Sequence, residues 1–254
     1  MMREETVFGP IYSRRLGRSL GINLLPTKGK ICNFDCIYCE CGWNCEGRGD
    51  TVLPTAAKVR NDLEDKLTEL MLDGTSIDSI TFSGDGEPTL NPEFPRIIDD
   101  TLFLRDAYCP GAKVSVLSNA TRVHVPEVFA ALCKVDNPIL KIDAPTDALV
   151  AKINQPAPGY SLERVVDALT RFDSQFILQT MFLKSPDFDS SAPEVLQGWM
   201  DIVRKLKPRE VMVYTIDRPT PQRGLEAFTV EQMRALVQPL LDEGFRIDIK
   251  GKTS

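Results

Sequence analysis

Several features that mark other classes of protein are missing from this sequence. It has no run of about 18 apolar residues, so we expect no membrane-spanning helix. Its first ten residues, "MMREETVFGP", contain neither an apolar stretch nor a small-residue cleavage site, which argues against a signal peptide. We therefore expect a cytoplasmic protein with no membrane partner, in which thiols stay reduced.

Positive charge is outnumbered by negative charge, with 30 Lys and Arg against 36 Asp and Glu. The formal net charge is −6 and the isoelectric point is about 5.0. Tight binding to nucleic acid depends mainly on neutralising phosphates, so this balance weakens that expectation. The one dense basic group consists of Arg14, Arg15 and Arg18. We interpret it either as a solvated loop or as a rim that binds phosphate or carboxylate groups.

Cysteine, by contrast, is concentrated in one place. Five of the seven cysteines lie between Cys32 and Cys45, and an odd number fits poorly with fully paired disulfides. Cys32, Cys36 and Cys39 form a C-x3-C-x2-C pattern, and three thiolates can hold three irons of a [4Fe–4S] cluster while the fourth iron stays open. The alternatives are a zinc site that takes Cys41 or Cys45 as a fourth ligand, or ordinary buried thiols.

Strand-like and helix-like segments alternate along the chain, which indicates a parallel sheet with crossover helices. No linker or repeat divides the sequence, so we predict a single domain over residues 1–254. Six β–α units are compatible with an open doubly wound sheet or an incomplete barrel. We expect strands at 19–25, 76–84, 112–120, 138–144, 175–183 and 209–217, with a short one at 245–250. We expect helices at 54–72, 92–108, 125–134, 146–154, 161–172, 192–207 and 229–244.

Unusual loops follow the first four predicted strands. The cysteines follow the first strand, and "GDGEP", "SNAT" and "DAPT" follow the next three. Ligands of parallel α/β proteins bind at the carboxyl ends of the strands. We therefore expect these loops to line one pocket.

The pattern C-x3-C-x-Tyr-Cys after the first strand, followed by "SGDGEP" after the second, resembles the radical S-adenosylmethionine (radical SAM) superfamily. The resemblance spans nearly the whole chain and implies an α/β fold, a partial (β/α)6 TIM-like barrel with the cluster loop after strand one. It implies a [4Fe–4S] cluster held by Cys32, Cys36 and Cys39, with the amino and carboxylate groups of SAM on the open iron. Reductive cleavage of SAM then gives methionine and a 5′-deoxyadenosyl radical, which removes hydrogen from the substrate.

The same resemblance implies which residues bind SAM, although it singles out no catalytic residue. The aromatic residue before the third cysteine is expected beside the adenine. The segment 84–87 resembles the family's glycine-rich loop, with Asp85 in place of the second glycine. Polar residues at the ends of later strands are expected to bind ribose and the methionine carboxylate. The expected SAM-binding residues are Tyr38, Gly84, Asp85, Gly86, Glu87, Ser118, Asn119, Lys141, Asp143, Gln179, Tyr214 and Ile216.

Two longer stretches, "FGPIYSRRLGRSLGINLLP" and "KIDAPTDALVAKINQP", resemble the branch related to wyosine tRNA-base synthases. Those synthases build a tricyclic base on a guanosine of tRNA from pyruvate, with a lysine Schiff base. This chain has no cysteine before Cys32, carries no flavodoxin domain and is acidic. We therefore expect a small, nucleobase-like or heterocyclic substrate, such as a modified purine that is salvaged or cleaved.

Other functions stay open. One alternative is modification of a base within tRNA, and the non-enzyme alternative is an iron–sulfur electron carrier or a zinc-binding protein. For the enzyme, the reaction class, lyase or transferase, is open, and the resemblance implies a reductase partner such as flavodoxin or ferredoxin. The phosphate contacts expected for tRNA are Arg14, Arg15, Arg18, Arg218 and Arg223.

Overall fold

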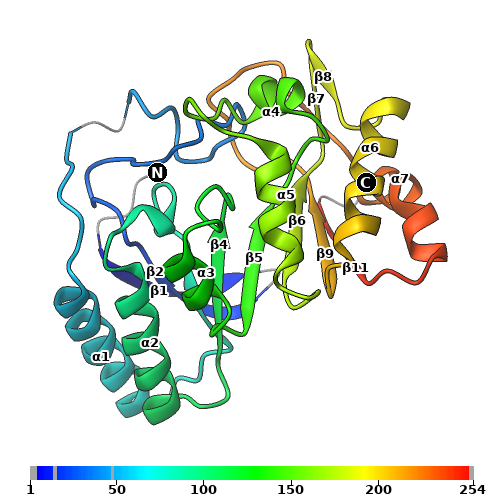
Figure 1. The fold of residues 1–254 in the computed structure, drawn as a ribbon. Helices are drawn as coiled ribbons and strands as arrows, with labels where there is room; N and C mark the ends of the chain where they lie inside the picture. Colours follow the sequence, from blue (N-terminus) through cyan, green and yellow to red (C-terminus); the bar gives the residue numbers. More distant parts are fainter. Residues whose placement is uncertain (1–4, 14–15, 47–48, 252–254) are drawn as a thin grey trace. The chain divides into compact units, whose positions relative to one another are not determined.

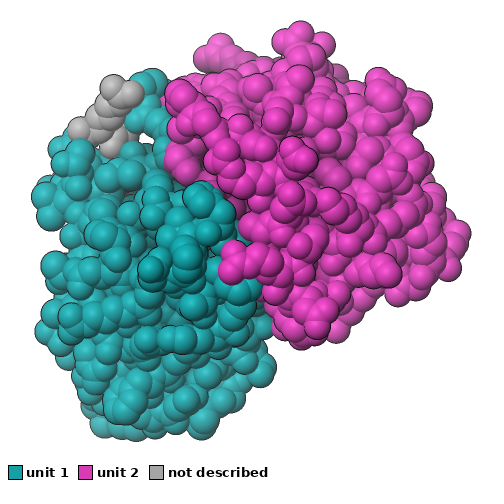
Figure 2. All heavy atoms as spheres, in the orientation of Figure 1, with its two compact units in different colours: residues 1–32, 44–118, 122–138 teal, residues 33–43, 119–121, 139–254 magenta. Residues whose placement is uncertain are grey.

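The structure is a computed structural model that describes residues 5–13, 16–46 and 49–251. The chain folds into two compact units, coloured teal and magenta in Figure 2. Unit 1 comprises residues 1–32, 44–118 and 122–138, and unit 2 comprises residues 33–43, 119–121 and 139–254. The single domain over residues 1–254 stays a prediction.

Unit 1 contains a sheet whose neighbouring strands are β1 (Val7–Ser13), β2 (Gly17–Ile22), β3 (Ser79–Phe82) and β4 (Lys113–Ser118). β1 runs antiparallel to β2, whereas β2, β3 and β4 are parallel. Leu20 lies opposite Ile80, and Ile80 lies opposite Val114. All three side chains are fully buried, which places the core of unit 1 on this sheet.

β1 was not among the predicted strands, because its sequence contains Gly9 and Pro10. Proline has no N–H group for a strand ladder and is tolerated mainly at sheet edges or bulges. β1 lies at the edge of the sheet, and its register with β2 shifts between Phe8 and Ile11. The edge position explains why this segment forms a strand despite its proline.

Three α-helices and a short 3-10 turn accompany these strands in the described part of unit 1: α1 (Ala56–Leu72), η1 (Pro88–Leu90), α2 (Phe94–Tyr108) and α3 (Pro126–Leu132). Thr55 caps α1 by accepting from the backbone N–H of Lys58. Contacts join α1 to α2 and α2 to α3 (Figure 1). Phe94 of α2 meets Phe82 of β3 edge-on, with ring centroids 6.3 Å apart.

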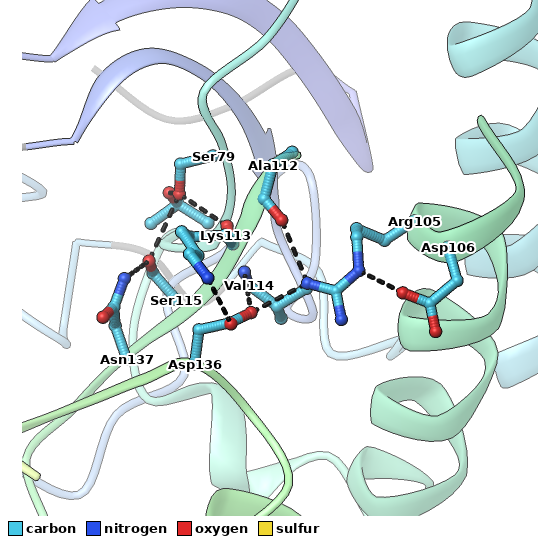
Figure 3. A network of polar contacts seen from close by, with 10 residues as sticks. Ser79, Arg105, Asp106, Ala112, Lys113, Val114, Ser115, Asp136 and Asn137 are labelled. Atoms are coloured by element: carbon cyan, nitrogen blue, oxygen red, sulfur yellow. Dashed lines mark hydrogen bonds and ion pairs between the residues drawn. The ribbon is translucent and has the colours of Figure 1, made fainter. Parts of the chain in front are cut away.

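A charged network lies at the amino end of β4 in unit 1 (Figure 3). The Asp136 carboxylate accepts from Arg105 Nη1 at 2.8 Å, from Lys113 Nζ at 3.1 Å and from the Val114 N–H at 2.9 Å. Arg105 also donates to the Ala112 carbonyl at 3.0 Å. The network therefore ties α2 to the start of β4.

Unit 2 contains the parallel strands β5 (Asn137–Lys141), which begins in unit 1, β6 (Ile177–Met181), β9 (Glu210–Tyr214) and β11 (Ile247–Lys250). They pair in the order β5, β6, β9, β11. A small antiparallel sheet, absent from the predictions, has the order β10 (Glu226–Ala227), β7 (Leu183–Ser185) and β8 (Phe188–Asp189). Its strands of two or three residues are too short for an alternating pattern to reveal.

The helices of unit 2 are α4 (Asp147–Ile153), α5 (Leu162–Thr170), α6 (Pro193–Leu206) and α7 (Val230–Asp242). Ser161 caps α5, and Thr229 forms a capping box with Gln232 at the start of α7. Trp199 of α6 is buried against Phe182 with ring centroids 5.1 Å apart, and its Nε1 donates to Thr180 Oγ1 at 3.0 Å.

The predicted alternation is confirmed, because each of the predicted strands and helices has a counterpart in the structure. The observed strands are shorter than predicted, since several predictions ran on into the polar loops that follow the strands. No helix in the described residues is both long and apolar enough to cross a membrane.

Candidate functional site

The glycine-rich loop after β3 lies against the segment that leads into the first cysteine of the motif. Gly86 forms a bridge with Ile31, whose N–H donates to the Asp85 carbonyl at 3.1 Å and whose carbonyl accepts from the Glu87 N–H at 3.0 Å. Gly86 has a φ of 137°, and a Cβ there would overlap the Ile31 carbonyl oxygen. Only glycine combines a favourable positive φ with the absence of a Cβ, so Gly86 is what allows the loop to approach Ile31 this closely.

Gly84 has a similar role on the other side of the loop. A Cβ at Gly84 would overlap the side-chain oxygen of Asn23. That oxygen accepts from the backbone N–H groups of Leu25 at 3.1 Å and Asp85 at 3.2 Å. Asn23 is fully buried and holds the loop in place, but it was not predicted, because its partners lie on two separate segments of the chain.

Glu87 is a buried carboxylate, 2 % exposed, at the end of this loop. Its Oε1 accepts from Ser118 Oγ at 2.8 Å, from Thr89 Oγ1 at 2.5 Å and from the Thr89 N–H at 3.1 Å. Unit 1 thus brings together Gly84, Asp85, Gly86, Glu87 and Ser118, which were all predicted site residues. The arrangement orients a carboxylate at the carboxyl ends of β3 and β4.

The cysteine loop of unit 2 is attached to the end of α4. The N–H of Asp35 donates to the Asn154 carbonyl at 2.8 Å, and the N–H of Ile37 donates to the Ile153 carbonyl at 3.0 Å. Cys36 and Cys39 form a turn in which the Cys39 N–H donates to the Cys36 carbonyl at 3.0 Å. These backbone bonds set the spacing of two of the three motif cysteines.

None of the three motif cysteines forms a disulfide, and all three are half-buried, Cys32 in unit 1 and the other two in unit 2. Over the residues that the structure describes, no three His, Cys, Asp or Glu side chains gather as a ready metal site. Three cysteines that form no disulfide are a suitable donor set for an iron–sulfur cluster. Burial raises the pKa of Cys36 to about 11, against the opposing charge of Lys141, so metal uptake must displace its proton.

A buried polar cluster in unit 2 contains three predicted residues and one that was missed. Asp143, two residues beyond β5, accepts from the Tyr38 hydroxyl, from Asn154 Nδ2 at 2.7 Å and from the Met181 N–H at 2.8 Å. Lys141 Nζ lies 3.6 Å from Asp143 Oδ1. Burial and the nearby Asp143 charge raise the pKa of Tyr38 well above its usual value, which keeps the phenol protonated as the donor.

Lys141 is held between two aromatic rings. Its Nζ bonds to the Tyr214 hydroxyl at 2.5 Å and lies 4.9 Å from the centre of that ring and 5.2 Å from the centre of the Tyr38 ring. Burial would lower the pKa of Lys141, but the charge of Asp143 and the contacts with Tyr214 outweigh it and raise that pKa. Unit 2 therefore presents a largely buried ammonium group at the last residue of a strand.

Asn154 is the residue of this cluster that was not predicted. It lies at the end of α4, and its amide bonds to a cysteine 118 positions away. No spacing pattern reveals a contact of that range. The one available signal was an asparagine directly before the turn residues "QP", in a stretch already linked to the resemblance.

The remaining predicted residues lie outside the two polar clusters around Glu87 and Asp143. Asn119 donates to Asn33 of the cysteine loop at 2.7 Å, while Gln179 is buried in β6 and Ile216 is half-buried after β9. Arg18 donates to the Ser76 carbonyl at 3.1 Å, before the start of β3. Arg14 and Arg15 lie outside the described residues.

The exposed Arg218 pairs with Glu40 of the cysteine loop at 2.7 Å. Its neighbour in the predicted phosphate-binding set, Arg223, is also exposed. Both arginines belong to unit 2.

The sequence is similar to those of several known proteins. The chain is 32% identical over 230 residues to a UPF0026 protein from Synechocystis, covering 87% of this chain and 79% of the relative. It is 31% identical over 236 residues to a protein from Brachyspira hyodysenteriae named GTPase Obg, covering 91% of this chain but spanning only 33% of that relative's length.

Solved structures share the fold at low sequence identity. A radical SAM methyltransferase from Sphaerobacter thermophilus superposes with a TM-score of 0.68 at 15% identity, covering 91% of this chain and 65% of that one. The structure of TYW1 with a lysine–pyruvate adduct gives a TM-score of 0.63 at 13% identity, covering 90% and 74% of the two chains. The predicted partial TIM-like barrel of the α/β class is confirmed by this likeness.

The family profile described as the Radical SAM superfamily matches residues 27–183, more than half of the chain. The matched range runs from before the cysteine motif to beyond Asp143 and Gln179, and so includes most of the site described above. The chain belongs to the radical SAM superfamily.

Proposed function

We propose that this chain is a radical SAM enzyme that binds a [4Fe–4S] cluster through Cys32, Cys36 and Cys39 and reductively cleaves SAM. The observation that supports this most directly is the set of three cysteines in the family's spacing, none in a disulfide, within the range that the superfamily profile matches. When bound, the cluster supplies the electron that breaks the sulfonium bond of SAM. We propose that the predicted SAM-binding residues bind and orient SAM.

The charges suit the two ends of the methionine part of SAM. The Glu87 carboxylate, oriented by Ser118 and Thr89, is proposed to accept from the ammonium group of SAM. The Lys141 ammonium, oriented by Tyr214 and Asp143, is proposed to pair with a carboxylate of SAM or of the substrate. As part of this proposal, Asp85 keeps its predicted place in the glycine-rich loop that binds SAM. Asn119 is proposed at the ribose or the methionine carboxylate, Gln179 at the ribose and Ile216 at the adenine.

For the substrate, we propose a small nucleobase-like or heterocyclic compound. The net charge of −6 favours this over tRNA, because a nucleic-acid substrate requires neutralised phosphates. Modification of a tRNA base is the second candidate, supported by the stretch around "SRRLG" that resembles the wyosine branch. An external reductase such as flavodoxin or ferredoxin is proposed as the electron donor, and the cytoplasm as the location.

The first test is anaerobic reconstitution of the full chain with iron and sulfide. We expect about four irons per chain and cleavage of SAM to methionine and 5′-deoxyadenosine when dithionite is added. Cys36→Ala should abolish both the iron content and the cleavage. The matched control is Cys133→Ala, since Cys133 is exposed and lies outside the cysteine loop, and it should keep both.

Two results would contradict the assignment: stoichiometric zinc in place of iron in the wild-type chain, or SAM cleavage that survives in Cys36→Ala. The substrate class needs a separate readout, which is the increase in 5′-deoxyadenosine when a candidate is added. An increase with purine analogues supports the small substrate. An increase with unmodified tRNA alone would replace it with the second candidate.

A further inference from the structure

The side-chain amide of Asn154 is placed between a candidate cluster ligand and a buried carboxylate. Asn154 is 1 % exposed at the end of α4. Its Nδ2 lies 3.3 Å from Cys36 Sγ, 2.7 Å from Asp143 Oδ2 and 3.0 Å from the Tyr38 hydroxyl oxygen. An amide nitrogen carries two hydrogens and no acceptor lone pair, so Asn154 is the donor in each of these contacts.

Asp143 fixes the direction of that amide. The Asp143 carboxylate is itself held by the Met181 N–H at 2.8 Å and by the Tyr38 hydroxyl. Because the amide group is planar, a bond from one N–H to this fixed acceptor sets where the other N–H points. That second N–H is therefore directed toward the neighbouring acceptors, which are the Cys36 sulfur and the Tyr38 oxygen.

The backbone places Cys36 independently of the amide. The carbonyls of Ile153 and Asn154 accept from the N–H groups of Ile37 and Asp35 on either side of Cys36. Replacing the Asn154 side chain leaves these bonds available. The contribution of the amide to the sulfur can thus be separated from the attachment of the loop.

We propose that Asn154 is a positioning residue which, through its N–H bond to Cys36 Sγ, raises the reduction potential of the cluster. This inference rests on the proposed function, in which Cys36 is a cluster ligand. A hydrogen bond to a ligand sulfur stabilises the electron-rich reduced cluster more than the oxidised one, and such bonds are an established means of setting cluster potentials. Removing the donor makes the cluster harder to reduce.

The test is a redox titration of the reconstituted full chain, followed by the electron paramagnetic resonance signal of the reduced cluster. Asn154→Leu removes both N–H groups at similar volume. We expect a tenfold lower ratio of reduced to oxidised cluster at a given potential, which is about 59 mV for a one-electron couple. Asn154→Asp keeps the shape of the side chain but replaces the donor with an oxygen, and it should shift the potential in the same direction at least as far.

The control is Thr180→Val, which removes a buried hydroxyl that bonds to Ile142 and Trp199 but touches no sulfur. It should lower stability without moving the potential. Equal potentials in wild type and Asn154→Leu, at full iron content, would overturn the proposal. So would loss of iron from both Asn154 variants with an intact unfolding curve, because Asn154 would then serve only to hold the loop. A wild-type chain that binds no iron would instead refute the proposed function itself.

Discussion

Two aspartates, one near each end of β5, each accept from a backbone N–H and lie near a cationic side chain, but their surroundings differ. Asp136, directly before the strand, accepts from a backbone N–H, an arginine and a lysine, and its side chain is 23% exposed (Figure 3). Asp143, two residues after the strand, accepts from a backbone N–H, a tyrosine and an amide, faces a lysine and is 0% exposed.

The difference shows which charges serve stability and which are candidates for function. In barrels of parallel strands, the amino ends contribute stability and the carboxyl ends carry the active site. Buried ion pairs also contribute little net stability compared with an apolar replacement. A buried pair at the carboxyl end, such as Lys141 with Asp143, is therefore a candidate for ligand binding, whereas the Asp136 network stabilises unit 1.

The largest effect in this comparison is expected from Asp143→Ala. The variant leaves the buried Lys141 ammonium without its carboxylate, and breaking a buried pair in this way costs about 3–5 kcal/mol. Asp136→Ala should cost about 1 kcal/mol, because the Asp136 carboxylate and its partner Lys113 are more exposed. Urea unfolding of the metal-free protein measures both, and equal losses would show that the two networks do not differ as described.

The next effect concerns the glycine loop, which depends on close backbone approach rather than on charge. Gly86→Ala places a methyl group against the Ile31 carbonyl at a positive φ, and we expect a loss of about 2–3 kcal/mol. The iron content after reconstitution should fall as well, because Ile31 directly precedes Cys32. Gly111→Ala is the matched control, since a Cβ there meets nothing within 4 Å. A tolerated Gly86→Ala would show that the bridge to Ile31 does not require glycine.

The smallest effect is a pH dependence. Burial alone would raise the pKa of Asp136, but the bonds from Val114, Arg105 and Lys113 outweigh it and lower that pKa below 3.8. The carboxylate therefore stabilises the fold at pH values above 3.8, and this contribution is lost as the pH falls through the lowered pKa. At pH 6, the free energy of unfolding of wild type should exceed that of Asp136→Asn by about 1 kcal/mol, after allowance for solvent screening.

The same comparison at acid pH tests whether the Asp136 charge causes this difference. The advantage of wild type over Asp136→Asn should shrink as the pH falls below about 4. Unfolding curves at pH 6, 4 and 3 measure this difference. A constant difference across that range would mean that the Asp136 charge is not what stabilises the network.

The sequence revealed local order well and long-range contacts poorly. Helix caps such as Thr55 and Ser161, and the alternation of strands with helices, depend on neighbours within a few residues, so they could be predicted. The cysteine motif and the glycine loop were identifiable because their spacing is local too. Asn154 and Asn23 were missed because each acts on a segment that only the folded chain brings near. β1 was missed because its proline obscured a strand at the edge of the sheet.

The pairing of Ile31 with Gly86 has a consequence for observing cofactor uptake. The Glu87 amide hydrogen is bonded to the residue directly before Cys32. Any ordering of that thiol upon metallation should slow the exchange of this hydrogen with deuterated solvent. The Glu87 amide would then report occupancy of the cysteines before any SAM is added.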